Sequence, residues 1–162
     1  MNYSESELRD MFGSVGRNVR IHKSCIVLGG KNIQVGSHVR IDCFSLLSAG
    51  EQGITIGDHV HIAVGVCLFG SGGRIEVNDF AGISARTLIY TATDDYTADN
   101  LTGPTIPDKY RKVIQGDVIL SKHSVIGCGL TGSTYGLIPF IAATSRSSLR
   151  SFASVGTGWP ST

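Results

Sequence analysis

Three side chains in this sequence are the best candidates for moving a proton: His61, Asp94 and Asp95. An imidazole titrates near neutral pH, and a neighbouring carboxylate can hold its ring in one orientation. The two aspartates can equally bind hydroxyl or amino groups of a ligand, or be ordinary loop acids. His61 also has a purely structural interpretation, because it stands directly before Ile62, a residue expected to point inward.

A cluster of basic residues is the best candidate for binding an anion. Its members, called the basic trio below, are Lys109, Arg111 and Lys112. Ammonium and guanidinium groups form charge-assisted hydrogen bonds to phosphate oxygens. The alternative is a solvated cluster without a ligand.

An internal repeat determines where these residues lie. Three nine-residue segments superimpose, and their starts lie 21 residues apart: Ile33–Ile41, Ile54–Ile62 and Ile75–Ile83. A fourth copy, Val118–Ile126, follows a long interruption, and a degenerate copy, Gly13–Ile21, comes first. Such self-similarity is typical of solenoid proteins, in which each unit packs on its neighbours.

Within the repeat an aliphatic residue recurs at every sixth position. A period of six fits neither a helix, with 3.6 residues per turn, nor an isolated strand, with two. It indicates a triangular coil in which each side is a short strand with one side chain pointing inward, and the remaining residues of each unit fit Gly-rich corners. An antiparallel sandwich explains short strands but not this period. The positions are Val15, Ile21, Val27, Val35, Ile41, Leu47, Ile56, Ile62, Leu68, Val77, Ile83, Ile89, Leu120 and Ile126.

Three histidines share one position of the repeat, the third after an inward aliphatic residue: His38, His59 and His123. We expect His38 and His59 to stack on successive coils at an exposed corner, which favours a solvated ladder over a binding site. His22, in the first coil, is expected to be structural.

Composition and charge exclude several classes of function. The chain has 162 residues, enough for one domain, and its net charge of +1 gives no electrostatic case for nucleic acid. No apolar run approaches the roughly 20 residues that span a bilayer. Acidic residues near the N-terminus replace the apolar core of a signal peptide, and the four cysteines lie far apart, as reduced thiols do. We therefore expect a cytoplasmic protein without membrane insertion.

The repeat units IQVGSHVRI, ITIGDHVHI and VILSKHSVIG resemble the hexapeptide-repeat acyltransferases over roughly residues 13–128. The resemblance implies an all-β, left-handed parallel β-helix of about five triangular coils, although generic chirality favours right-handed crossovers. The run from 62 to 96 resembles the sugar O- and N-acetyltransferases of bacterial surface-polysaccharide clusters. It implies transfer of an acetyl group from acetyl-CoA to a hydroxyl or amino group of a sugar or nucleotide-sugar. The product would be used in the biosynthesis of surface lipopolysaccharide of the O-antigen type. It also implies a homotrimer with active sites between subunits and no metal.

The resemblance assigns roles to the candidate residues. Acyl transfer needs a base near the attacking atom and donors for the oxyanion. We expect His61, Asp94 and Asp95 to be catalytic, and Tyr96 and Arg86 to bind the acceptor. The basic trio would then meet the phosphates of coenzyme A. Relatives commonly carry a histidine in the long interruption, and this sequence has none there.

The predicted domain organisation has two parts. Residues 1–128 form the β-helix, with an extruded loop at 90–117 that either helps to wall the acceptor pocket or is a surface excursion. Residues 129–162 form an atypical tail, in which only Ile138 of five expected aliphatic positions fits the repeat. Our hypothesis is that this tail is flexible or arises from a change of reading frame, which sequencing of the coding DNA tests.

Two other functions remain open on the sequence. A non-catalytic or decayed β-helix protein is one, supported by the tail and by the missing loop histidine. A zinc enzyme of the γ-carbonic-anhydrase type is the other. That chemistry needs three histidines converging on one metal, and the histidines here show no such spacing.

Overall fold

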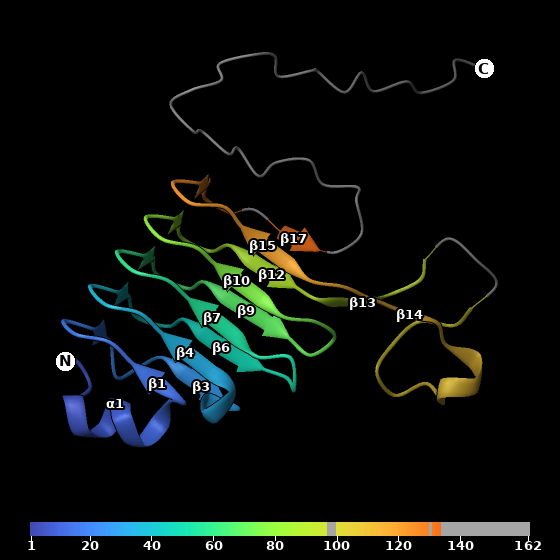
Figure 1. Ribbon diagram of the computed structural model, residues 1–162. Coiled ribbons are helices and arrows are strands. Elements are labelled where there is room, and N and C mark those ends of the chain that lie inside the picture. The colour runs from blue at the N-terminus through green and yellow to red at the C-terminus, as the bar shows by residue number, and fades with distance from the viewer. Residues whose placement is uncertain (97–99, 130, 134–162) are drawn as a thin grey trace, which may run out of the picture.

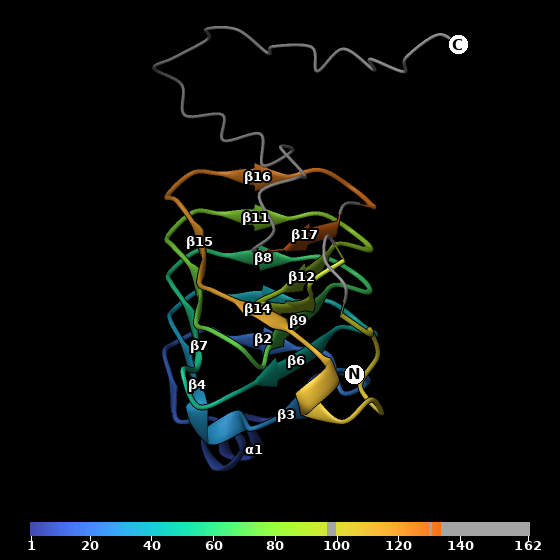
Figure 2. The ribbon, with the colours of Figure 1, turned by 90° about the vertical axis from the view of Figure 1, so that its right-hand side faces the viewer.

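The computed structural model describes residues 1–96, 100–129 and 131–133, and they form a parallel β-helix. Three walls of parallel strands enclose a prism, and each wall contains five strands, one from each coil. Figures 1 and 2 together show the coil rising from the N-terminus in a left-handed sense, from the first wall to the second and then the third. The predicted architecture is confirmed, and the antiparallel sandwich is excluded.

The three walls follow the chain in strict rotation. The first wall consists of β1 (Ser14–Val15), β4 (Ile33–Val35), β7 (Ile54–Ile56), β10 (Ile75–Val77) and β15 (Val118–Leu120). The second consists of β2 (Arg20–Ile21), β5 (Arg40–Ile41), β8 (His61–Ile62), β11 (Gly82–Ile83) and β16 (Val125–Ile126). The third consists of β3 (Ile26–Leu28), β6 (Leu46–Ala49), β9 (Cys67–Gly70), β12 (Leu88–Tyr90) and β17 (Thr131–Ser133).

The core is the stack of inward aliphatic residues that the period of six predicts. Ile41, Ile62 and Ile83 pair in register on successive strands, and each is at most 1% exposed. Of the fourteen predicted positions, Val15 and Val27 in the first coil are partly buried against the core, and the others are buried. Each coil therefore covers the apolar face of the next.

One corner of the prism carries a continuous stack of rings. His38, His59, Phe80 and His123 all have a left-handed backbone, with φ between 57° and 62°. Their ring centroids lie 4.6, 5.0 and 4.9 Å apart along the stack. The predicted stacking of the first two is confirmed, and Phe80 fills the place between His59 and His123. A bulky side chain rarely adopts this backbone conformation, and the repeated ring contacts offset its strain.

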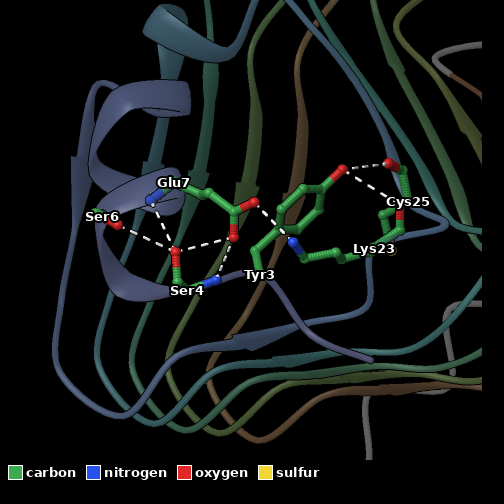
Figure 3. A network of polar contacts seen from close by, with 6 residues as sticks. All are labelled: Tyr3, Ser4, Ser6, Glu7, Lys23 and Cys25. Atoms are coloured by element: carbon green, nitrogen blue, oxygen red, sulfur yellow. Dashed lines mark hydrogen bonds and ion pairs between the residues drawn. The ribbon is translucent and has the colours of Figure 1, made fainter.

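The N-terminal end of the prism is closed by α1 (Glu5–Met11). Ser4 and Glu7 form a capping box at its start, and Leu8 and the following Phe12 are buried against the first coil. Figure 3 shows how the helix is tied down: Lys23 Nζ lies 2.7 Å from Glu7 Oε1. The helix therefore covers the apolar end of the first coil, which a solenoid must shield from solvent.

The extruded loop contains regular structure that the sequence did not reveal. After β12, the strand β13 (Ala92–Asp94) pairs antiparallel with β14 (Val113–Gln115). The 3-10 helix η2 (Asp108–Tyr110) lies between them, and a second one, η1 (Gly30–Asn32), occupies a corner of the second coil. Figure 1 shows β13, η2 and β14, together called the arm below, projecting from the side of the prism.

The C-terminal boundary of the β-helix lies beyond the predicted residue 128. The strand β17 pairs in parallel with β12, with Gly132 opposite Ile89. The third wall of the fifth coil is therefore present, although its inward position holds a glycine, which hid it from the aliphatic pattern. The rest of the predicted tail, 134–162, lies outside the described residues. No helix in the described part of the chain is long and apolar enough to cross a membrane.

Candidate functional site

The base of the arm holds Asp94 in a fixed orientation. Arg111 donates to Asp94 Oδ1 from Nε at 3.1 Å and from Nη2 at 2.8 Å, and the Gly103 amide donates to Oδ2 at 2.7 Å. The Asp94 side chain is only 10% exposed. Hydrogen bonds from Arg111 and then Gly103 hold the pKa of Asp94 below its usual value. An ionised, oriented carboxylate suits binding of an amino or hydroxyl group better than removal of a proton.

Asp95 lies deeper in the arm than Asp94. Its side chain is almost fully buried, and Lys112 Nζ lies 3.0 Å from Asp95 Oδ2. The Asp95 amide also donates to the Lys112 carbonyl at 2.8 Å. The pair lies where β13 ends and β14 begins, so it clamps the two strands of the arm together.

An open cleft of about 580 Å³ lies between the arm and the third wall. Asp94 and Arg111 form its polar part, and Tyr90 and Tyr96 bring aromatic rings to it. The Tyr90 ring stacks on Phe69 of the coil below, with centroids 4.6 Å apart. The cleft thus combines a fixed carboxylate with ring faces, a combination that suits a sugar carrying an amino or hydroxyl group. The other lining residues are Ser71, Ala92, Thr93, Pro104 and Val113.

His61 lies on the second wall and takes no part in lining that cleft. Its Nε2 lies 2.8 Å from Asp42 Oδ2, and Arg40 donates to Asp42 Oδ1 at 2.6 Å. Burial alone would raise the pKa of Asp42, but the hydrogen bonds from His61 and Arg40 outweigh it and lower the pKa. The arrangement leaves the other face of a half-exposed imidazole free to meet a ligand, with a carboxylate orienting the ring.

Asp42 is a functional candidate that the sequence reasoning missed. A signal was available, because Asp42 directly follows inward Ile41 and the register pairs Arg40 with His61 on the next coil. Arg86, in contrast, was expected from the sequence to bind the acceptor. It occupies an exposed left-handed corner position (φ 58°) and is absent from the lining of the arm cleft.

The basic trio is divided rather than gathered. Arg111 and Lys112 have aspartate partners, as described above, whereas Lys109 Nζ lies 4.7 Å from the centroid of the Tyr110 ring. Lys109 alone of the three has no acidic partner among the described residues. The same described part of the chain holds no group of three His, Cys, Asp or Glu side chains placed to share a metal ion.

Comparison with known proteins gives a consistent picture. No family model matches the chain. The chain is 41% identical over 126 residues to the dTDP-4-amino-4,6-dideoxy-D-glucose acyltransferase of Escherichia coli. The aligned residues make up 77% of this chain and 65% of that protein. The chain thus spans slightly less than two thirds of the length of this curated relative.

Two solved structures are similar in both sequence and fold. AntD, an N-acyltransferase from Bacillus cereus in complex with dTDP and 3-hydroxybutyryl-CoA, is 44% identical, with a TM-score of 0.74 over 82% of this chain and 69% of that one. A variant of AntD in complex with dTDP-4-amino-4,6-dideoxyglucose and coenzyme A is 42% identical, with a TM-score of 0.68 over 82% and 76% of the two chains.

Proposed function

The chain belongs to the sugar acyltransferases of the hexapeptide-repeat β-helix type, and on that premise we propose that it transfers an acyl group from an acyl-CoA to the amino group of a dTDP-linked amino sugar. In this reaction the amine nitrogen attacks the thioester carbonyl, the C–N bond forms, and the C–S bond breaks. The bound ammonium group first gives up one proton to a base, which frees its lone pair for the attack. The nitrogen loses a second proton as the amide forms, and the departing coenzyme A thiolate takes up that proton. The observation that carries the proposal is the fixed, ionised Asp94 in the arm cleft.

Asp94 would bind and orient the amino group. Both of its oxygens already accept hydrogen bonds from the protein, which keeps the carboxylate charged and immobile. A charged carboxylate in a cleft attracts a sugar ammonium group. It therefore favours a sugar that receives the acyl group on an amine over one that receives it on a hydroxyl. We assign Asp95 to holding the arm, and Tyr96 to packing on the sugar ring. Arg86, at its exposed corner, remains a candidate acceptor-binding residue.

We propose that a second subunit completes the site. His61 would act as the base across a subunit boundary, because it lies on a different wall from the arm cleft of its own chain. The outward row of the third wall, with Ile26 and Leu28 more than half exposed, offers apolar surface that association would bury. A homotrimer is the state we propose. Lys109 would meet coenzyme A phosphates.

A complementation experiment tests the shared site. His61→Gln and Asp94→Asn proteins are each inactive or nearly so under this proposal, but unfolded and refolded together they form mixed oligomers in which some boundaries carry both native residues. Activity should then reappear. If the mixture stays as inactive as its components while remaining oligomeric, the two residues do not meet across a boundary.

The activity itself is tested by following release of the free thiol. The purified protein is incubated with dTDP-4-amino-4,6-dideoxyglucose and either acetyl-CoA or 3-hydroxybutyryl-CoA, and dTDP-glucose serves as the hydroxyl control. We expect turnover with the amino sugar only, and the faster donor identifies the acyl chain. Asp94→Asn should abolish turnover, whereas Asp10→Asn, the same change at an exposed aspartate of α1, should not.

A silent assay would point to the alternative, a non-catalytic or decayed β-helix. The result that supports it is that neither donor releases thiol and that coenzyme A does not bind. We propose a reducing cytoplasm as the compartment, because all four cysteines are free thiols. An acylated nucleotide-linked amino sugar would serve surface-polysaccharide synthesis of the O-antigen type.

A further inference from the structure

We infer that the N-terminal end of the second wall carries a diphosphate-binding site built around Arg20 and Arg40. The inference deepens the proposed function and rests on it, because a nucleotide-linked sugar and coenzyme A each carry a diphosphate. The site lies on a different wall from the one that borders the arm cleft, and none of its residues lines that cleft.

The two arginines are forced to lie side by side. Arg20 and Arg40 are register partners on β2 and β5, and hydrogen-bonded strands lie about 4.8 Å apart. Alternation along each strand sends the neighbouring Ile21 and Ile41 into the core, so both guanidinium groups stand on the outer face. Two like charges in register repel each other unless an anion lies between them.

Their charge is only partly neutralised. Arg40 donates to Asp42 Oδ1, and the other oxygen of Asp42 is engaged by His61. Arg20 has no acidic partner within the residues that the structure describes. The single carboxylate of this patch is therefore already saturated, and an excess of positive charge remains at Arg20.

A cavity adjoins this charge. It has a volume of about 420 Å³, large enough for a diphosphate with part of a nucleoside, and a second cavity of the same volume borders Arg20 on its other side. Guanidinium groups bind phosphate oxygens through two parallel N–H donors, so two adjacent arginines can hold two phosphoryl groups in a row. His22 and Asn2 add polar groups to the rim. The remaining lining residues are Ile41, Asp42, Cys43 and Val64.

The test measures binding directly, by calorimetry, with three probes: inorganic pyrophosphate, dTDP and coenzyme A. Arg20→Gln removes the unpaired charge, and Arg20→Lys keeps the charge but lacks the two parallel N–H donors of a guanidinium group. Arg9→Gln, at an exposed arginine that is paired with Glu5 on α1, is the matched control. Arg20 is exposed, so the variants should fold, and their circular dichroism verifies this.

We expect pyrophosphate to bind the wild-type protein and Arg20→Gln to weaken it by roughly tenfold or more, as the loss of a charge-assisted hydrogen bond predicts. The Kd of Arg20→Lys should lie between those of the wild type and Arg20→Gln, and the Kd of Arg9→Gln should match that of the wild type. Whichever of dTDP and coenzyme A shows the same loss is the source of the diphosphate. No binding of pyrophosphate to the wild type, or an unchanged Kd in Arg20→Gln, overturns the inference. If pyrophosphate behaves as expected but no acyl transfer occurs, the proposed function fails and the site stands.

Discussion

Arg111 places two of its N–H groups on a single carboxylate oxygen of Asp94, at 2.8 and 3.1 Å, and so fixes the acid at the base of the arm. A lysine keeps the charge but cannot supply this fork. We therefore expect Arg111→Lys to lower kcat/KM by roughly 100-fold, the cost of a misplaced substrate-binding group. Steady-state thiol release with the amino sugar measures it.

The matched control for that change is Arg74→Lys. Arg74 pairs with Glu76 and Asp117 on the first wall, away from the arm cleft, so the same substitution should leave kcat/KM within about twofold of the wild type. Equal losses in both variants would show that Arg111 acts through general stability and not through Asp94.

The link between α1 and the first coil should depend on pH. A hydrogen bond from Lys23, followed by those from Ser4, lowers the pKa of Glu7 from 4.5 to about 2. A carboxyl with a depressed folded-state pKa stabilises the fold above its unfolded value of 4.5, and this stabilisation is lost as the pH falls toward 2. Glu7→Gln should thus lower the thermal midpoint slightly at pH 7 and not at all near pH 2. Salt should reduce the difference, because the pair is exposed.

Thermal unfolding of the two proteins from pH 7 to pH 2 measures this difference. Asp10→Asn on the same helix is the control, because no ion pair engages Asp10 among the described residues. A gap between wild type and Glu7→Gln that stays constant down to pH 2 would contradict the role of the charge.

The inward stack should make the fold sensitive to a single core truncation. Ile62 lies between Ile41 and Ile83 and is fully buried, so Ile62→Ala leaves a cavity that rigid neighbouring coils cannot close. We expect a loss of about 2–5 kcal/mol in the free energy of unfolding. Ile119→Ala removes the same atoms from a half-exposed outward position of the first wall and should cost less than about 1 kcal/mol. Chemical denaturation measures both.

The sequence predicted the prism well because its information is local and periodic. Every sixth residue must face the axis, so Ile41, Ile62 and Ile83 could be placed without coordinates. The fifth coil was cut short at residue 128 because Gly132, at an inward position, carries no aliphatic side chain to mark it. The stacking of His38 on His59 followed from their shared position in the repeat, whereas Phe80 occupies the same position with a different residue type and was not predicted to join them.

The contacts of the candidate site were not predictable in the same way. Asp94 and Arg111 lie 17 residues apart in a segment without a repeat, and only the antiparallel pairing of β13 with β14 brings them together. Asp42 meets His61 by a different route, through the register of adjacent coils. That second contact follows from the repeat once neighbours on successive strands are compared, and the first does not.

The pairing of Asp42 with His61 makes the last prediction. A base role requires His61 to be held in one orientation by an acid that stays ionised, and the lowered pKa of Asp42 provides this throughout the neutral range. His61→Gln should then lower kcat by roughly 100- to 10,000-fold with little change in KM. Asp42→Asn should lower kcat by a smaller factor, because the imidazole loses the partner that orients it. His59→Asn removes an imidazole from the ring stack, where asparagine tolerates the left-handed backbone, and should leave kcat unchanged. A wild-type kcat in His61→Gln would reduce the pair to a structural link between the second and third coils.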